Sequence, residues 1–312
     1  MIRRLGPSDV LRQVLPGRLG GEPLASTHDA LARAPRPLSP AELLRWAVAP
    51  SKDIRALGVL RSGRLAAAAV VRPRSGPRAW EVAHLFASEG AVDELEELLE
   101  GCVAHVGSRG GERLFLRMPQ HGRAPQDGET EGPARRAGFV PAFTEEVFRR
   151  HAATVPGSDG PLLGLRPTLP ADDYGLFRLY CAALPTEVRA AGGLTFEQWR
   201  DARERAAGSV REYVREDGEA VRCWLRLEQA SGELIVDAML HPDEEWVAER
   251  LIGDAGLLAW RHARATWIVP SYAPALSAAL LRRGWTASER YAMWVRPVAI
   301  PVREPSLAAA RA

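Results

Sequence analysis

Residues 280–296 read LLRRGWTASERYAMWVR, and residues 134–150 read ARRAGFVPAFTEEVFRR. Each stretch leaves a helix-like segment through arginine and reaches a glycine followed by an aromatic residue, Gly284-Trp285 and Gly138-Phe139. Each then crosses a short turn into a strand-like segment that ends in arginine. The match indicates that one structural unit is written twice in the chain.

The segments upstream of these stretches repeat in the same order. IRALGVLRSGRLAAAAVV around Gly63 and VREYVREDGEAVRCWLRL around Gly218 each contain two strand-like runs joined at a turn, and Asp217-Gly218 is a strong hairpin signal. Each hairpin is followed by a strand, an amphipathic helix and a strand that ends in proline: 80–86, 95–106 and 113–119 in the first half, and 234–240, 247–259 and 265–270 in the second. The shared order predicts a tandem duplication.

The duplication also predicts the domain boundaries. The stretch HAATVPGSDGPL has the composition of a linker. We therefore expect one domain over residues 1–152, a linker over 153–161 and a second domain over 162–302. The last residues, 303–312, are expected to form a flexible tail.

Composition excludes several classes of protein. Among 312 residues, 41 basic residues face 39 acidic ones, so a basic stripe for nucleic acid or a membrane surface is not expected. The three cysteines are far apart and have no metal-ligand spacing, so no metal site is expected. Neither a signal peptide nor an apolar run of membrane-spanning length is present. These features predict a cytoplasmic protein.

The order of elements resembles the GNAT acetyltransferase superfamily over nearly the whole chain, and the segments RRAGF and LRRGW resemble its Y-x-x-x-G-F motif. The resemblance implies two α/β domains of the α+β type, each a mixed, mostly antiparallel sheet flanked by helices. It implies transfer of an acyl group from acetyl-CoA, or another acyl-CoA, to an amine on a small molecule or peptide. It also implies that the two domains pack on each other, in a monomer or a homodimer.

In that family, backbone N–H groups at the start of the long helix hold the pyrophosphate of the cofactor, in a loop written [QR]-x-x-G-x-[GA]. The first half has ASEGAVDELEELL there, so the resemblance implies cofactor contacts from Ser88, Gly90 and Ala91. The second half has HPDEEWVAERLI, where Asp243 and Glu244 replace glycine. A carboxylate near a phosphate costs roughly 3 kcal/mol. We therefore expect acyl-CoA to bind the first half.

The general acid of the family is a tyrosine four residues before the glycine. Here those positions are Ala134 and Leu280, so neither half has it. The nearest substitutes lie just past the fifth strand of each half, His121 in PQH and Tyr272 in PSY. These two residues are the candidate proton donors.

The general base of the family lies on the fourth strand. Glu81 in the first half and Asp237 in the second are the candidates, and His84 is more simply a core histidine. Asp237 interrupts the apolar run LIVDAML, where a carboxylate is costly unless it is paired or faces a cleft. An arginine of the hairpin, Arg222 or Arg226, would make Asp237 structural. A cleft would make it a ligand contact.

Two functions remain open at this point. One is an acyl-CoA-dependent N-acyltransferase with its chemistry in one half, and the other is a catalytically inactive protein that binds a small molecule or peptide on the same fold. The second half is rich in tryptophan, which fits either a large aromatic core or an apolar ligand cleft. These tryptophans are Trp224, Trp246, Trp260, Trp267, Trp285 and Trp294.

Overall fold

The computed structural model describes residues 2–6, 8–10, 23–32, 44, 54–88, 90–120, 127–150, 163–230, 232–259 and 264–298. The predicted linker at 153–161, the predicted tail at 303–312 and the candidate His121 lie outside the described residues. Within the described part, no helix is long and apolar enough to cross a membrane.

From the hairpin onward, the two halves contain the same series of strands and long helices. The first half has strands β1 (Ile2–Arg4), β2 (Arg55–Arg61), β3 (Arg64–Pro73), β4 (Ala79–Ala87), β5 (Arg113–Pro119) and β6 (Val140–Arg149), helices α3 (Val92–Ser108) and α4 (Asp127–Arg136), and the 3-10 turn η1 (His28–Ala30). The second half has strands β7 (Arg166–Pro167), β8 (Ser209–Asp217), β9 (Ala220–Ala230), β10 (Glu233–Leu240), β11 (Ala265–Pro270) and β12 (Thr286–Pro297). Its helices are α5 (Asp173–Ala183), α6 (Thr186–Gly192), α7 (Phe196–Ala202), α8 (Ala248–Ala259) and α9 (Pro274–Arg282), with 3-10 turns η2 (Pro170–Asp172) and η3 (Pro242–Val247).

Glycine sets the two hairpin turns that the sequence predicts. Gly63 and Gly218 have φ angles of 78° and 60°, in the left-handed region that glycine adopts without strain. Ser62 shares that region, with φ of 51°. Both hairpins pair in antiparallel register, β2 with β3 and β8 with β9.

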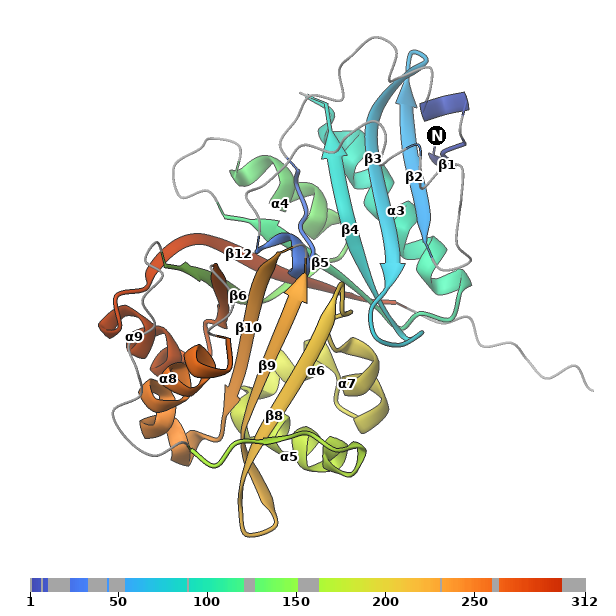
Figure 1. Cartoon of the computed structure of the whole chain (residues 1–312). Coiled ribbons are helices and arrows are strands. Elements are labelled where there is room, and N and C mark those ends of the chain that lie inside the picture. Colours follow the sequence, from blue (N-terminus) through green and yellow to red (C-terminus); the bar gives the residue numbers. More distant parts are fainter. Residues whose placement is uncertain are drawn as a thin grey trace, which may run out of the picture.

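All the strands join in one twelve-stranded sheet of order β1-β2-β3-β4-β5-β12-β6-β11-β10-β9-β8-β7 (Figure 1). The order is symmetric about the β12–β6 pair, and the last strand of each half pairs with the fifth strand of the other half, β12 with β5 and β6 with β11. The predicted mixed, mostly antiparallel sheet flanked by helices is confirmed. The exchange of the last strands, which joins the two sheets into one, is an additional finding.

The exchange carries side chains into the opposite core. Trp294 of β12 packs in the core beneath α3, with Leu98 and Leu116 of the first half. Phe148 of β6 packs in the core beneath α8, with Leu251 of the second half. Each half therefore depends on the other for a large buried side chain.

We expect Trp294→Ala and Phe148→Ala each to lower the free energy of unfolding by about 3–5 kcal/mol, because both side chains are at most 1% exposed. Hydrogen exchange separates the two effects. Trp294→Ala should reduce amide protection in α3, and Phe148→Ala in α8. Loss of protection confined to the half in which each residue lies in sequence would contradict the exchange.

Two groups of helices cover the two faces of the second-half strands. Helices α8 and α9 cover one face of β9–β11 through an apolar core. On the opposite face lie α5, α6 and α7, which bring a cluster of aromatic and aliphatic side chains against β8–β10. Figure 1 shows these two groups of helices on either side of the orange and yellow strands.

Candidate functional site

Strands β10 and β11 separate after a short parallel contact. They pair from Leu234 with Ala265 to Val236 with Trp267, and the next residue of β10 is Asp237. The N–H of Leu234 donates to a carbonyl on the β11 side, whereas the N–H of His241 donates to β9. By this alternation the N–H and C=O groups of Ala238 and Leu240 point into the gap.

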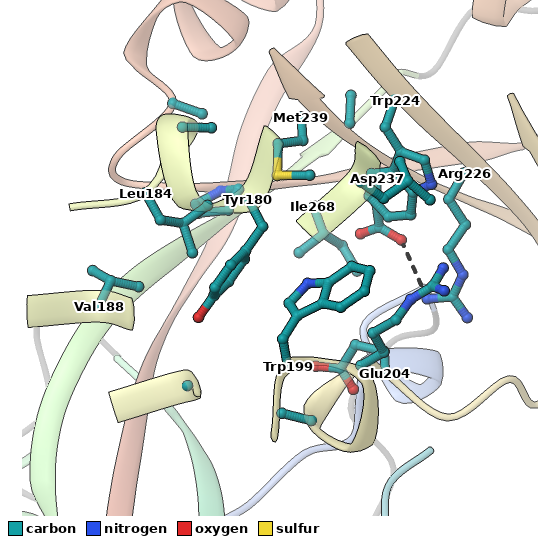
Figure 2. Close-up of a pocket in the computed structure, with 18 of the residues that line it drawn as sticks. Tyr180, Leu184, Val188, Trp199, Glu204, Trp224, Arg226, Asp237, Met239 and Ile268 are labelled. Carbon is teal, nitrogen blue, oxygen red and sulfur yellow. Dashed lines mark ion pairs between the residues drawn. The ribbon is translucent and has the colours of Figure 1, made fainter. Parts of the chain in front are cut away.

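A cavity of about 570 Å³ occupies this gap. It is lined on one side by α5–α7 and on the other by the start of α9 and by η3, so it passes through the sheet between β10 and β11. Its size is that of a pocket for a small organic ligand. Figure 2 shows Asp237, Met239 and Trp224 at the sheet, facing Tyr180 and Trp199 of the helices.

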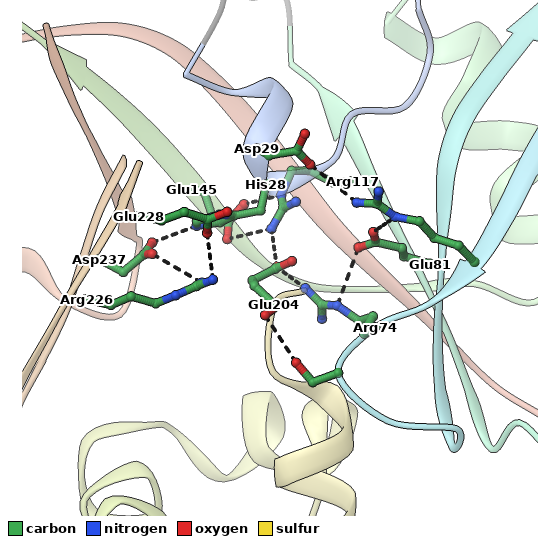
Figure 3. Close-up of polar contacts among 12 residues, drawn as sticks. His28, Asp29, Arg74, Glu81, Arg117, Glu145, Glu204, Arg226, Glu228 and Asp237 are labelled. Carbon is green, nitrogen blue, oxygen red and sulfur yellow. Dashed lines mark hydrogen bonds and ion pairs between the residues drawn. The ribbon is translucent and has the colours of Figure 1, made fainter. Parts of the chain in front are cut away.

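Asp237 lies on the wall of this cavity and is held by residues from both halves. Its Oδ1 lies 2.8 Å from Nε2 of His28, a buried residue of η1 in the first half. Its Oδ2 is 3.7 Å from Arg226, whose closer contact is a 2.6 Å bond to Glu228. Burial alone would raise the pKa of Asp237, but His28, Arg226 and Arg117 outweigh burial and lower it. Figure 3 shows the contacts of Asp237 with His28 and Arg226.

The sequence left two alternatives for Asp237, a pair with a hairpin arginine or a position in a cleft, and the structure shows features of both. Of the two arginines considered, Arg226 lies opposite Asp237 in the strand register and near its carboxylate, whereas Arg222 lies within 3.9 Å of Asp243. Yet Asp237 also lines the cavity. Its carboxylate is thus both charge-compensated and next to a space that can hold a ligand.

Tyr272 lines the same cavity. It follows β11, and its ring meets Phe143 of β6 edge-on at 5.4 Å between centroids. Burial, together with the nearby Glu145 and Tyr180, raises the pKa of the Tyr272 phenol far above its ordinary value. The structure therefore places a neutral phenol and an ionised carboxylate in one cavity.

Glu81 lies instead in a network of ion pairs at the junction of the halves. One oxygen accepts from Arg72 at 2.6 Å, and the other lies 3.6 Å from Arg74. Arg74 also donates to Glu204 of the second half, which accepts from Arg117 at 2.6 Å. Figure 3 shows this network beside the His28–Asp237 pair. Glu81 is thus engaged by two arginines and is not among the residues that line the cavity, and its role as a general base of the first half stays a prediction.

No protein-family model and no curated protein matches the sequence. Among solved structures, a GCN5-related N-acetyltransferase from Sphaerobacter thermophilus is similar with a TM-score of 0.56, over 96% of this chain and 95% of its own, at 15% identity. A tandem GNAT protein from the clavulanic acid biosynthesis pathway is similar with a TM-score of 0.50, over 96% of this chain and 98% of its own, at 16% identity. The chain has the tandem GNAT fold. This confirms the fold expected from RRAGF and LRRGW, and a likeness at this identity shows the fold alone.

Each half has one pair of parallel strands that separate after a short contact, β4 with β5 and β10 with β11. In the first half, residues 24–26 fill the opening between the two strands. Leu24 donates its N–H to the carbonyl of Leu85 on β4, and Ser26 donates its N–H to the carbonyl of Arg117 on β5. Ala25 between them is 2% exposed in the core beneath α3. The segment 24–26 thus bridges the strands at the place that stays open in the second half.

In the first-half loop predicted to hold the cofactor, two backbone N–H groups already donate hydrogen bonds within the protein. Ser88 donates its N–H to Ala66 at 2.7 Å, and Ala91 donates its N–H to Ser88 at 3.0 Å. Gly90 adopts the left-handed region, with φ of 73°. Cofactor binding by Ser88, Gly90 and Ala91 stays a prediction, which the filled opening beside them disfavours.

The second-half loop carries carboxylates in place of a phosphate cradle. The N–H groups of Asp243 and Glu244 already donate to His241. Glu244 forms a 2.7 Å ion pair with Arg215, while the side chain of Asp243 is 80% exposed. The start of this helix therefore offers few donors to an anion.

His28 is the residue that sequence reasoning missed. It lies in an irregular segment 209 residues before its partner Asp237, and nothing in its neighbours marks it. Its side chain is 4% exposed. Only the fold brings it to the cavity, because segment 24–32 crosses from the first opening to the second.

Proposed function

We propose that the protein is an acyl-CoA-dependent N-acyltransferase whose chemistry takes place in the second half. The observation that carries the proposal is the open passage between β10 and β11, with Asp237 and Tyr272 on its walls. The corresponding opening of the first half is bridged by Leu24 and Ser26. The three cysteines are unpaired, which suits the reducing cytoplasm that we propose as its location.

The residues of the passage fit part of an acyl-CoA molecule. The free edge of β10 at Ala238 and Leu240 can pair with an extended arm that carries amides, as in strand addition. The diphosphate end fits less well, because Asp243 and Glu245 bring negative charge and the loop amides are engaged. We therefore expect weak binding of the acyl donor, with most of the contact along the arm.

Bound acyl-CoA would supply the activated carbonyl. The amine reacts in its neutral form, after its ammonium has released one proton to solvent water. Asp237 accepts a hydrogen bond from the neutral amine and orients its lone pair toward the carbonyl carbon. The nitrogen becomes acidic as its bond to carbon forms, so a carboxylate with a lowered pKa can still take its proton. Tyr272 keeps its proton at neutral pH because its pKa is raised, and it can give that proton to the sulfur as the C–S bond breaks.

The alternative is a protein of the same fold that binds an amine without transferring an acyl group to it. The engaged amides and the carboxylates at the start of η3 favour it. The cavity, Asp237 and the aromatic walls would serve such a protein equally well. Turnover in the presence of acyl-CoA separates the two functions.

The decisive test combines the full chain with acetyl-CoA and a panel of amines, and measures thiol release and acylated product by mass spectrometry. We expect product, and we expect Tyr272→Phe to lower kcat by about tenfold or more while the affinity for the amine is kept. Gly90→Val compares the halves: Gly90 has a φ of 73°, so valine distorts the first-half loop, and the rate should stay unchanged if the second half is the site. Binding of amines with no transfer from any acyl-CoA would support the alternative, and loss of transfer in Gly90→Val would move the site to the first half.

A further inference from the structure

The carboxylate of Asp237 lacks a full set of partners. Its Oδ2 makes no hydrogen bond to any described residue, because Arg226 lies 3.7 Å away and is drawn to Glu228. The indole N–H of Trp224 is likewise buried without a partner in the described part of the chain. The strand register pairs Asp237 with Arg226 and Met239 with Trp224, so all four side chains share one face of the sheet. Buried polar groups of this kind call for a partner.

The charges around the cavity favour a cation. Its lining contains six carboxylates, from Glu145, Asp201, Glu204, Glu212, Asp237 and Glu245, and four guanidinium groups, from Arg74, Arg200, Arg203 and Arg226. Within the lining, carboxylates therefore outnumber guanidinium groups by two. Two arginines outside the lining form ion pairs with carboxylates other than Asp237: Arg117 with Glu145 and Glu204, and Arg78 with Asp201. A ligand ammonium near Asp237 would meet a carboxylate whose ion pair with an arginine is longer, at 3.7 Å, than those of Glu145 and Glu212, at 2.6 and 2.5 Å.

The opposite wall is apolar and largely aromatic. Trp199 and Tyr180 lie 6.2 Å apart between ring centroids, and Leu184 and Val188 extend this wall (Figure 2). Phe143 and Tyr272 close a second side. Flat side chains around a space of about 570 Å³ suit a flat apolar group rather than a highly hydrated one.

We infer that the ligand of this cavity is a small primary amine carried on an aromatic or similarly flat apolar group. Its ammonium lies against Asp237, its body packs against Trp199 and Tyr180, and an acceptor atom, where the ligand has one, faces the Trp224 indole. As the identity of the acyl acceptor, this inference rests on the proposed function. As a statement about binding, it can be tested without any acyl donor.

The test uses calorimetry on the full chain with three probes: 2-phenylethylamine, 2-phenylethanol and 1,4-diaminobutane. The first has both charge and ring, the second has the ring alone, and the third has charge alone. We expect 2-phenylethylamine to bind about tenfold to a hundredfold more tightly than either of the others. Quenching of tryptophan fluorescence should accompany binding, because Trp199 and Trp224 line the cavity.

Asp237→Asn is the key variant, since asparagine keeps the shape of the side chain and an oxygen for His28. It should weaken binding of the amine about tenfold or more and leave binding of the alcohol unchanged. Asp93→Asn is the matched control, because Asp93 is exposed on α3 and does not line the cavity. It should change neither affinity.

Equal affinity for amine and alcohol, or no effect of Asp237→Asn, would overturn the assignment of Asp237 as the ammonium contact. Tighter binding of 1,4-diaminobutane than of 2-phenylethylamine would contradict the inference that the ligand carries a flat apolar group. Binding as expected with no acyl transfer would remove the proposed enzyme activity and leave the ligand class standing. Transfer to polar amines without binding of 2-phenylethylamine would support the enzyme activity and contradict the inferred ligand class.

Discussion

Asp237→Asn should reduce the rate of acyl transfer by about 10²–10⁴-fold, the usual contribution of a group that accepts a proton in the transition state. Asparagine keeps an oxygen for Nε2 of His28, which lies 2.8 Å from Asp237. Arg226 keeps its 2.6 Å bond to Glu228. The fold should therefore survive the change, and the loss should appear in kcat/KM for the amine.

The pH dependence of stability gives a second readout of the same residue. Because the pKa of Asp237 is lowered in the folded protein, its carboxylate contributes stability above the pKa of the unfolded chain. That contribution is lost as the pH falls through the lowered folded value. The wild type and Asp237→Asn should therefore converge in stability in acid and differ near neutral pH. A rate loss in Asp237→Asn that is matched by an equal loss of folded protein would assign Asp237 a purely structural role.

The elements that sequence reasoning predicted are those with a local signal. Gly63 and Gly218 mark the hairpins because their turns require positive φ, and Gly138 and Gly284 do the same before the last strands. Asp237 stood out because a charge inside LIVDAML is costly, and it lies on the cavity wall. Each of these positions can be read within a window of a few residues.

The features that the sequence did not reveal depend on contacts between distant segments. The apolar alternation of β6 and β12 is the same whichever strand each one pairs with, so nothing in it indicates the exchange. Tyr180 and Trp199 have the spacing of ordinary core residues, and only the divergence of β10 from β11 leaves a space beneath them. The filling of the first opening by residues 24–26 is invisible for the same reason.

Arg117→Met should lower the free energy of unfolding by about 3–5 kcal/mol, as expected when one partner of a buried ion pair is removed. The Arg117 side chain is 2% exposed. Its Nε donates to Glu145 at 2.6 Å, and its Nη2 donates to Glu204 at 2.6 Å. Burial alone would lower the pKa of Arg117, but Glu145 in particular outweighs burial and raises it. Without the guanidinium, Glu145 would remain as a buried charge.

A double substitution tests whether the cost arises from that stranded charge. Arg117→Met combined with Glu145→Gln should recover part of the lost stability in urea unfolding, because the glutamine carries no charge into the junction. Arg136→Ala serves as the control, since its ion pair with Glu96 lies at the surface, with the arginine side chain 50% exposed. That change should cost no more than about 1 kcal/mol. An equally small loss of stability in Arg117→Met and Arg136→Ala would contradict the prediction. The ion pairs of Arg117 with Glu145 and Glu204 would then not hold the two halves together. The shape of the neighbouring cavity would depend on the exchanged strands β6 and β12 alone.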